Sequence, residues 1–165
     1  IKGYTKVNDF EENNNYLIVS GDYAMSSENA KNDDSYYRNA EIISKKIDVF
    51  GNVYISSDNP NLIWTRKTNK YLYNSVVNNY LNAGYYLGYY LTTSKTAQSW
   101  NYIDKDNVKK LYNDNYIRGY IGLDATNKRF TNDSSGESIE IYKYSEDIKV
   151  NYYESANVGG TEWKL

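Results

Sequence analysis

The middle of the chain repeats itself at a spacing of about 40 residues, and this repeat limits the possible folds more than any other feature. Residues 70–74 (KYLYN) and 109–113 (KKLYN) agree at four of five positions and stand 39 residues apart. Tyr-Leu-Gly at 86–88 matches Tyr-Ile-Gly at 120–122, and Leu-Thr at 91–92 matches Phe-Thr at 130–131. Such self-similarity is typical of domains built from stacked copies of one small unit.

Each copy carries strand signals rather than helical ones. Apolar residues at helical spacing are rare, whereas short β-branched or aromatic runs bounded by Asn, Asp, Gly and Ser recur throughout. These runs predict strands at 16–20, 22–26, 40–50, 52–56, 62–65, 70–74, 85–91, 99–103, 110–113, 120–123, 129–131 and 139–144. Short strands at such close spacing predict an all-β domain.

A degenerate third copy lies upstream, where 16–19 (YLIV) and 53–56 (VYIS) precede Trp64. Trp64 stands 36 residues before Trp100, and we expect both to close their units as core anchors. The units span about 13–67, 68–107 and 108–145, with residues 27–39 as an insertion in the first. Each unit alone would leave its apolar face in water, so three are expected to close together. This predicts a β-trefoil of three four-strand repeats, with a β-sandwich as the alternative.

Residues 13–145 resemble the ricin-type β-trefoil lectin domains. In that family each unit tends to end in Gln-x-Trp, and residues 98–100 read Gln-Ser-Trp, whereas the other two units lack the Gln. The resemblance implies carbohydrate binding by a module attached to a larger secreted glycosidase, peptidase or toxin. Residues 1–12 would then be an N-terminal lead-in, and 146–165 an extra strand, a tail or a linker to a next module.

The resemblance also implies where sugar would bind. Family sites use an Asp just after the second strand of a unit, an aromatic platform and a later amide. Asp124 holds that place in the third unit, and Asp22 or Tyr23 in the first, whereas the middle unit has Tyr89 or Tyr90 instead of an Asp. In the third unit Asn127 and Asn132 would supply hydrogen bonds and Phe130 or Tyr120 the stacking surface. The alternative is that residues 124–127 form only an Asx-stabilised turn.

Tyrosine is the most unusual component of the composition, with 21 residues against 3 Phe. Together with abundant Asn and Lys, it fits the bias of an AT-rich genome such as that of clostridia. Residues 85–90 alternate in a way that places half of the rings outward, and an exposed Tyr pair would suit a sugar or protein partner. A strand that buries one face and wets the other is the simpler interpretation.

Absent residue types limit the chemistry further. The chain has neither His nor Cys, which excludes Ser-His-Asp and Cys-His nucleophiles and Cys/His zinc sites. Residues 104–107 (DKDN) lack the Gly and distal Glu of a calcium loop and predict a turn. No phosphate loop or dinucleotide fingerprint is present, so we expect neither metal, cofactor nor catalysis.

The net charge and the hydropathy of the chain limit the kinds of partner that it could bind. A net charge of −2, without a basic cluster longer than two residues, argues against nucleic acid. No apolar run approaches the roughly 20 residues that span a membrane. We therefore expect a non-catalytic, glycan-binding module of a larger secreted or cell-surface protein of a low-GC Gram-positive bacterium, recognising host or mucin-type glycans. Alternatives are an adhesin that binds a host surface protein, a structural or assembly domain, and a carboxylate-pair hydrolase.

Overall fold

The computed structural model describes residues 3–115, 119–145 and 152–153 and confirms an all-β domain. Within the described residues the helical segments are three 3-10 turns, η1 (Lys31–Asp33), η2 (Pro60–Leu62) and η3 (Thr68–Lys70). The strands of the described residues are β1 (Gly3–Val7), β2 (Asn15–Ser20), β3 (Tyr23–Ala30), β4 (Asp34–Ile42), β5 (Lys45–Asp48), β6 (Val53–Ser56), β7 (Trp64–Arg66), β8 (Leu72–Asn74), β9 (Asn79–Tyr85), β10 (Tyr89–Ser94), β11 (Trp100–Lys105), β12 (Val108–Asn113), β13 (Tyr120–Asp124), β14 (Arg129–Asp133), β15 (Glu140–Ser145) and β16 (Tyr152–Tyr153).

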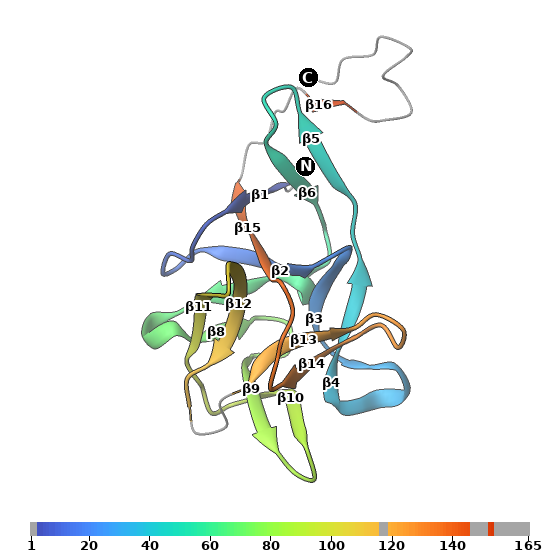
Figure 1. The fold of residues 1–165 in the computed structure, drawn as a ribbon, viewed down its shortest axis with the longest axis vertical. Coiled ribbons are helices and arrows are strands. Elements are labelled where there is room, and N and C mark those ends of the chain that lie inside the picture. Colours follow the sequence, from blue (N-terminus) through green and yellow to red (C-terminus); the bar gives the residue numbers. More distant parts are fainter. Residues whose placement is uncertain (1–2, 116–118, 146–151, 154–165) are drawn as a thin grey trace.

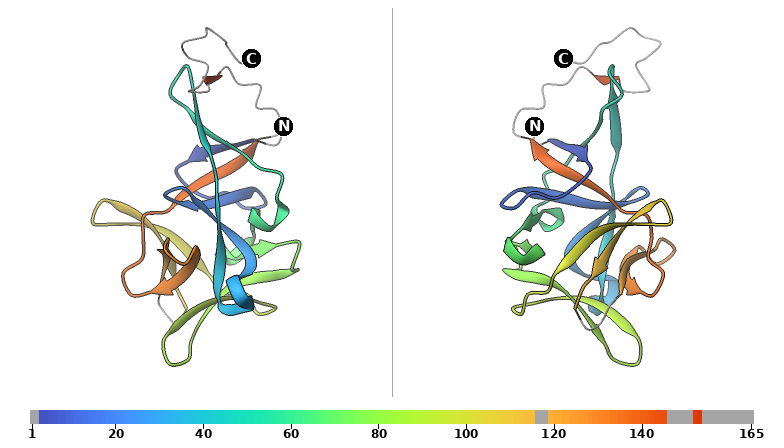
Figure 2. Two further views of the ribbon diagram at one scale, coloured as in Figure 1. Left: turned by 90° about the vertical axis from the view of Figure 1, so that its right-hand side faces the viewer. Right: turned by 60° about the vertical axis from the view of Figure 1, so that its left-hand side comes forward.

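All of these strands belong to one antiparallel sheet, whereas a β-sandwich would consist of two. One path of hydrogen-bonded neighbours runs β11-β12-β13-β14-β4-β3-β2-β15-β1-β6-β5-β16, and β7 to β10 branch from it through β2. The sheet curls around its core (Figures 1 and 2), with the β5–β6 hairpin projecting at one end and the β9–β10 hairpin at the other.

The core has two parts on opposite faces of β2. Tyr16 and Ile18 point into the main core with Trp64 and Trp100, whereas Leu17 and Val19 join a second core. The second core adds residues of β1, β6 and β15, among them Tyr4, Ile55 and Tyr142. The uninterrupted apolar run of β2 follows from this burial on both faces.

Two tyrosines, the buried Tyr4 and the half-buried Tyr102, should make the domain sensitive to alkali. Burial raises the pKa of Tyr4 to about 12, with Tyr144 and Asp58 adding to it, and burial raises that of Tyr102 to about 12. The neutral phenols therefore stabilise the folded state fully below their unfolded pKa of about 10, and this stabilisation is lost as the pH rises toward 12. Urea unfolding across that range should show the loss, and Tyr4→Phe should reduce it. An identical fall in the variant would contradict this assignment.

A buried arginine joins three strands at one end of the core. Arg38 is 1% exposed, and its guanidinium donates hydrogen bonds to four acceptors. These are the carbonyl oxygens of Ser27 (2.8 Å), Ser35 (2.9 Å) and Leu91 (3.2 Å), and Oδ1 of Asn29 (2.8 Å). Burial lowers the pKa of Arg38 to about 10, so it remains charged at neutral pH. Arg38 thereby ties β3 and β4 to β10.

Several segments differ from the sequence prediction. Residues 85–91 form a hairpin rather than one strand, because Leu87 and Gly88 take positive φ values and turn the chain between β9 and β10. The match between 86–88 and 120–122 is therefore wrong. Residues 27–39, which the sequence analysis treats as an insertion, form the end of β3, η1 and most of β4 in one antiparallel hairpin, and β5 and β6 form a further hairpin after it.

The segments at both ends of the predicted repeat region also differ in part. Residues 3–7 of the expected lead-in form β1, which pairs with β15 from Gly3–Ser145 to Val7–Ile141 and also with β6. Of residues 146–165, only β16 is described, paired with β5, and the rest of the predicted tail lies outside the described residues.

Other predictions are confirmed. Trp64 and Trp100 are fully buried. Residues 104–107 form the β11–β12 turn, with positive φ at Asp106 and Asn107, as a two-residue hairpin loop of type I′ requires. Asn occupies five of the ten non-glycine positions with positive φ in the described chain, so part of the high Asn content serves these turns.

Candidate functional site

The hollows most relevant to the predicted site lie between the β3–β4 and β13–β14 hairpins. The larger, about 360 Å³, is lined by Tyr23, Lys31, Asn39, Ala40, Glu41, Ile42 and Lys128. The smaller, about 220 Å³, is lined by Ala30, Lys31, Asn32, Thr126, Asn127 and Arg129. They share Lys31 and use successive residues of the β13–β14 turn, and together we call them the inter-hairpin groove. The larger hollow falls within the range of about 300–1,000 Å³ typical of small-ligand sites.

Strand pairing positions both walls of the groove. β14 pairs with β4 through Arg129–Asn39 and Phe130–Arg38, and the amide of Ala40 donates to the carbonyl of Lys128 (3.0 Å). Residues about 90 positions apart in the chain therefore face each other across a continuous backbone ladder. The groove walls are consequently rigid strands and tight turns.

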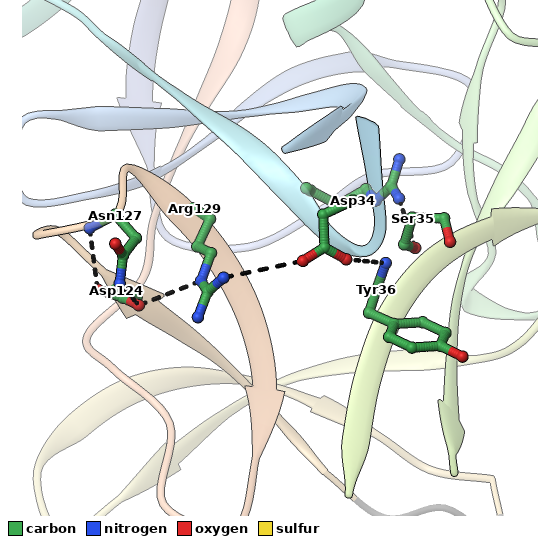
Figure 3. Close-up of polar contacts among 7 residues, drawn as sticks. Asp34, Ser35, Tyr36, Asp124, Asn127 and Arg129 are labelled. Atoms are coloured by element: carbon green, nitrogen blue, oxygen red, sulfur yellow. Dashed lines mark hydrogen bonds and ion pairs between the residues drawn. The ribbon is translucent and has the colours of Figure 1, made fainter. Parts of the chain in front are cut away.

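A network of ion pairs and hydrogen bonds around Arg129 supports one side of the groove (Figure 3). Arg129 lies between two carboxylates, with Nε 3.1 Å from Oδ2 of Asp124 and an Nη nitrogen 3.9 Å from Oδ2 of Asp34. Its guanidinium also stacks 3.8 Å from the ring centre of Tyr37. Asp124 accepts further hydrogen bonds from the backbone (3.1 Å) and side-chain (2.8 Å) nitrogens of Asn127. These contacts fix the orientation of Arg129 at the smaller hollow.

The same contacts determine the protonation state of Asp124. Hydrogen bonds from the side chain and backbone of Asn127, followed by the charge of Arg129, hold the pKa of this carboxyl below its usual range. Asp124 therefore stays ionised at neutral pH, with both oxygens engaged inside the protein. This is the Asx-stabilised turn of the alternative interpretation, and Asp124 orients Arg129 and Asn127 from behind the groove.

The structure separates the remaining predicted site residues. Phe130 is fully buried in the core and Asn132 is 2% exposed, so neither side chain reaches a ligand at the surface. The prediction that Phe130 stacks on sugar is wrong, because β14 alternates and directs this ring inward. Tyr23 lines the larger hollow and Asn127 the smaller. Asp22 is exposed but lines neither.

Tyr89 belongs to a separate surface, the tip of the β9–β10 hairpin, and Tyr90 follows it on β10. Tyr85, Tyr86 and Leu87 are 64%, 67% and 91% exposed, and Tyr89 packs edge-on against Tyr85. The ring of Tyr90 covers Gly84, where an added Cβ would lie only 2.0 Å from a carbon of the ring. The same ring packs against Tyr36 of β4, with 5.3 Å between the two ring centres. We call residues 85–89 the aromatic tip.

The backbone of Leu87, within the aromatic tip, is in a strained conformation with positive φ. A branched apolar residue at φ 54° is unfavourable, whereas Asn tolerates that conformation. We expect Leu87→Asn to raise the free energy of unfolding by about 0.5–1 kcal/mol while removing the most exposed apolar side chain of the hairpin. Thermal unfolding of the two proteins measures this difference, and a clear loss of stability in the variant would show that Leu87 is not strained.

Sequence reasoning missed Lys31, Asn39, Lys128 and Arg129 as groove residues. Lys31 and Asn39 fell in a segment interpreted as an insertion, Lys128 was given no role, and Arg129 was placed at the start of a predicted strand. The usable signal was the turn at 124–127, which the sequence analysis gave as the alternative to a sugar site and which the structure contains. What it could not supply was the pairing of β14 with β4.

No protein-family model, curated protein or solved structure matches this chain. In residues 3–115, 119–145 and 152–153, acidic side chains do not gather in a group that could hold a metal ion. The same residues contain no helix with the length and apolarity needed to cross a membrane.

Proposed function

We propose that this chain is a non-catalytic glycan-binding module with β-trefoil architecture, carried by a larger secreted or cell-surface bacterial protein. The observation that carries the proposal is the inter-hairpin groove, where the half-buried ring of Tyr23 shares a hollow with polar side chains such as Asn39. A ring face suits the apolar face of a sugar, and amides suit its hydroxyls. Such a shallow site would bind each sugar weakly, as expected of modules that act through several attachments.

The trefoil part of the proposal is supported by matching positions in the three hairpins β3–β4, β9–β10 and β13–β14. Arg38, Leu91 and Phe130 are buried residues on their second strands, and Ala40 of β4 and Asn132 of β14 are buried as well. Leu91 precedes Trp100 by nine residues and Phe130 precedes Ile139 by nine, whereas Arg38 precedes Trp64 by 26 because the β5–β6 hairpin intervenes.

The two tryptophans support the same correspondence. Nε1 of Trp64 donates to the carbonyl of Met25 (3.0 Å), and Nε1 of Trp100 donates to the carbonyl of Leu81 (2.9 Å). Both acceptors lie on the first strand of the hairpin in the same unit. The motif residue Gln98 exchanges two hydrogen bonds with the backbone of Ala83 (2.8 and 3.0 Å), which gives it a structural role in the middle unit.

Titration of the chain against a broad panel of host and mucin-type glycans tests the function. We expect binding in the micromolar-to-millimolar range, with backbone NMR shifts concentrated on β3, β4 and the β13–β14 turn. The double variant Asn39→Ala/Thr126→Ala should bind about tenfold more weakly, because two groove hydrogen-bonding groups are removed. Ser75→Ala, an exposed change outside the groove, is the matched control.

Two results would reject the proposal. One is the absence of binding to every glycan at millimolar concentration. The other is binding whose NMR shifts map away from the groove and which the groove variant leaves unchanged.

The aromatic tip favours a second function, binding of a protein partner. Three adjacent apolar side chains that are mostly exposed form the kind of patch that marks interaction sites. Loss of partner binding in Tyr85→Ser/Tyr86→Ser, with all glycans inert, would favour this adhesin-like function over the first. Retained partner binding in that variant would remove the tip from consideration.

A further inference from the structure

From the charges that line the inter-hairpin groove, we infer that its ligand is an acidic glycan, one that carries sulfate or carboxylate groups. This inference rests on the proposed glycan-binding function and narrows its ligand class. It is built on two lysines, Lys31 in η1 and Lys128 in the β13–β14 turn.

The side chains of both lysines lack an interaction partner within the described part of the chain. Lys31 and Lys128 are exposed, and neither side chain forms a hydrogen bond, an ion pair or a cation–π contact with a described residue. Lys31 lines both hollows, and Lys128 lines the larger one beside it. Two lysine side chains from different hairpins therefore line one hollow, and neither forms an ion pair with a carboxylate of the described residues.

The carboxylates near the groove are, by contrast, already engaged. Asp124 and Asp34 both contact Arg129 and line neither hollow. Glu41 does line the larger hollow, and its Oε2 accepts a hydrogen bond from Asn59 (2.8 Å). These three carboxylates are thus each engaged by a described residue, whereas the two lysine side chains are not.

The charge balance of the lining follows from these contacts. Two cationic side chains without a carboxylate partner, Lys31 and Lys128, line the groove together with the single carboxylate of Glu41, whereas the charge of Arg129 is balanced by Asp124 and Asp34. The whole chain carries a net charge of −2, so this local excess opposes the overall sign. Charge-assisted hydrogen bonds from ammonium and guanidinium groups recognise sulfate and carboxylate oxygens well. A neutral sugar would leave both lysines unused.

The experiment compares one glycan backbone in three forms: chondroitin sulfate oligosaccharides, the same oligosaccharides desulfated, and the desulfated oligosaccharides with their carboxyl groups reduced. Neutral members of the mucin-type panel are titrated in parallel. We expect affinity to fall in the order sulfated, carboxylated, neutral. We also expect affinity for the acidic forms to fall steeply as the ionic strength approaches about 1 M, where charges are screened beyond roughly 3 Å.

The charge variants decide whether the groove is responsible. Lys31→Gln/Lys128→Gln should weaken binding of the acidic forms by about tenfold and leave neutral glycans unaffected. Lys70→Gln/Lys95→Gln makes the same change in net charge at exposed positions outside the groove and should retain binding. Unchanged thermal unfolding verifies that both variants fold.

The outcomes separate the inference from the function on which it rests. If neutral glycans bind in the groove as tightly as acidic ones, or if both double variants lose equal affinity, the inference of an acidic ligand is overturned while glycan binding stands. If glycans of every class fail to bind at millimolar concentration, the proposed function itself is rejected. If the ordered affinities and the selective effect of Lys31→Gln/Lys128→Gln are observed, both stand.

Discussion

Replacing Arg38 with Met should lower the free energy of unfolding by about 3–5 kcal/mol, because it removes a buried charge whose acceptors cannot find water. Four oxygens, three of them backbone carbonyls, receive hydrogen bonds from this guanidinium. Met matches the length of the apolar stem but donates nothing, so these acceptors would stay buried without the donor. Arg38→Lys keeps the charge but not the planar array of donors, and we expect an intermediate loss.

Chemical unfolding followed by tryptophan fluorescence measures these losses. Lys95→Met is the matched control, since it removes a basic side chain that is exposed and bonded to one carbonyl, and it should cost about 0.5 kcal/mol or less. A similarly small effect for Arg38→Met would mean that the three strands are held by other contacts.

The second large effect concerns the two tryptophans of the main core. Trp64→Ala and Trp100→Ala should each lower the free energy of unfolding by about 3–5 kcal/mol, because each leaves a large cavity in a packed core. Trp→Phe at either position should lower the free energy of unfolding by less, since Phe keeps much of the ring volume. The remaining loss would come from the smaller ring and from the missing indole hydrogen bond to the hairpin carbonyl.

The pair also tests the correspondence of the units. If Trp64 and Trp100 close equivalent units, the two Ala variants should lose equal stability within about 1 kcal/mol, as should the two Phe variants. Equivalent contacts that respond very differently would argue against equivalent units. A loss below about 1 kcal/mol at both sites would contradict their role as core anchors.

Much of the fold was predictable because short apolar runs and turn residues are local signals. The β11–β12 hairpin and the core positions of both tryptophans follow directly from them. The β9–β10 turn was missed because its turning residues include Leu87, which has no turn signature of its own. The burial of Arg38 was not predictable either, since arginine is usually exposed and only the packing of three strands makes its four acceptors converge.

The site was predictable to a smaller extent. Asn127 and Tyr23 were named from the resemblance to ricin-type lectin domains, and both line the groove. Phe130 failed as a ligand contact because the position of β14 in the core, rather than its amino-acid type, decides which way its side chains point. Lys31 and Lys128 acquire meaning only from the pairing of β4 with β14, which no local pattern encodes.

The pairing of β1 has a mechanical consequence. Gly3 pairs with both Ser145 and Ser56, so residues 3 and 145 lie at the same end of the β1–β15 ladder (Figure 1). Tension applied between residues 3 and 145 would therefore peel β1 away one pair at a time, beginning at Gly3, instead of shearing all its hydrogen bonds together. β1 would act as a compliant element that lengthens under load, while the main core, anchored by Trp64 and Trp100, keeps its shape.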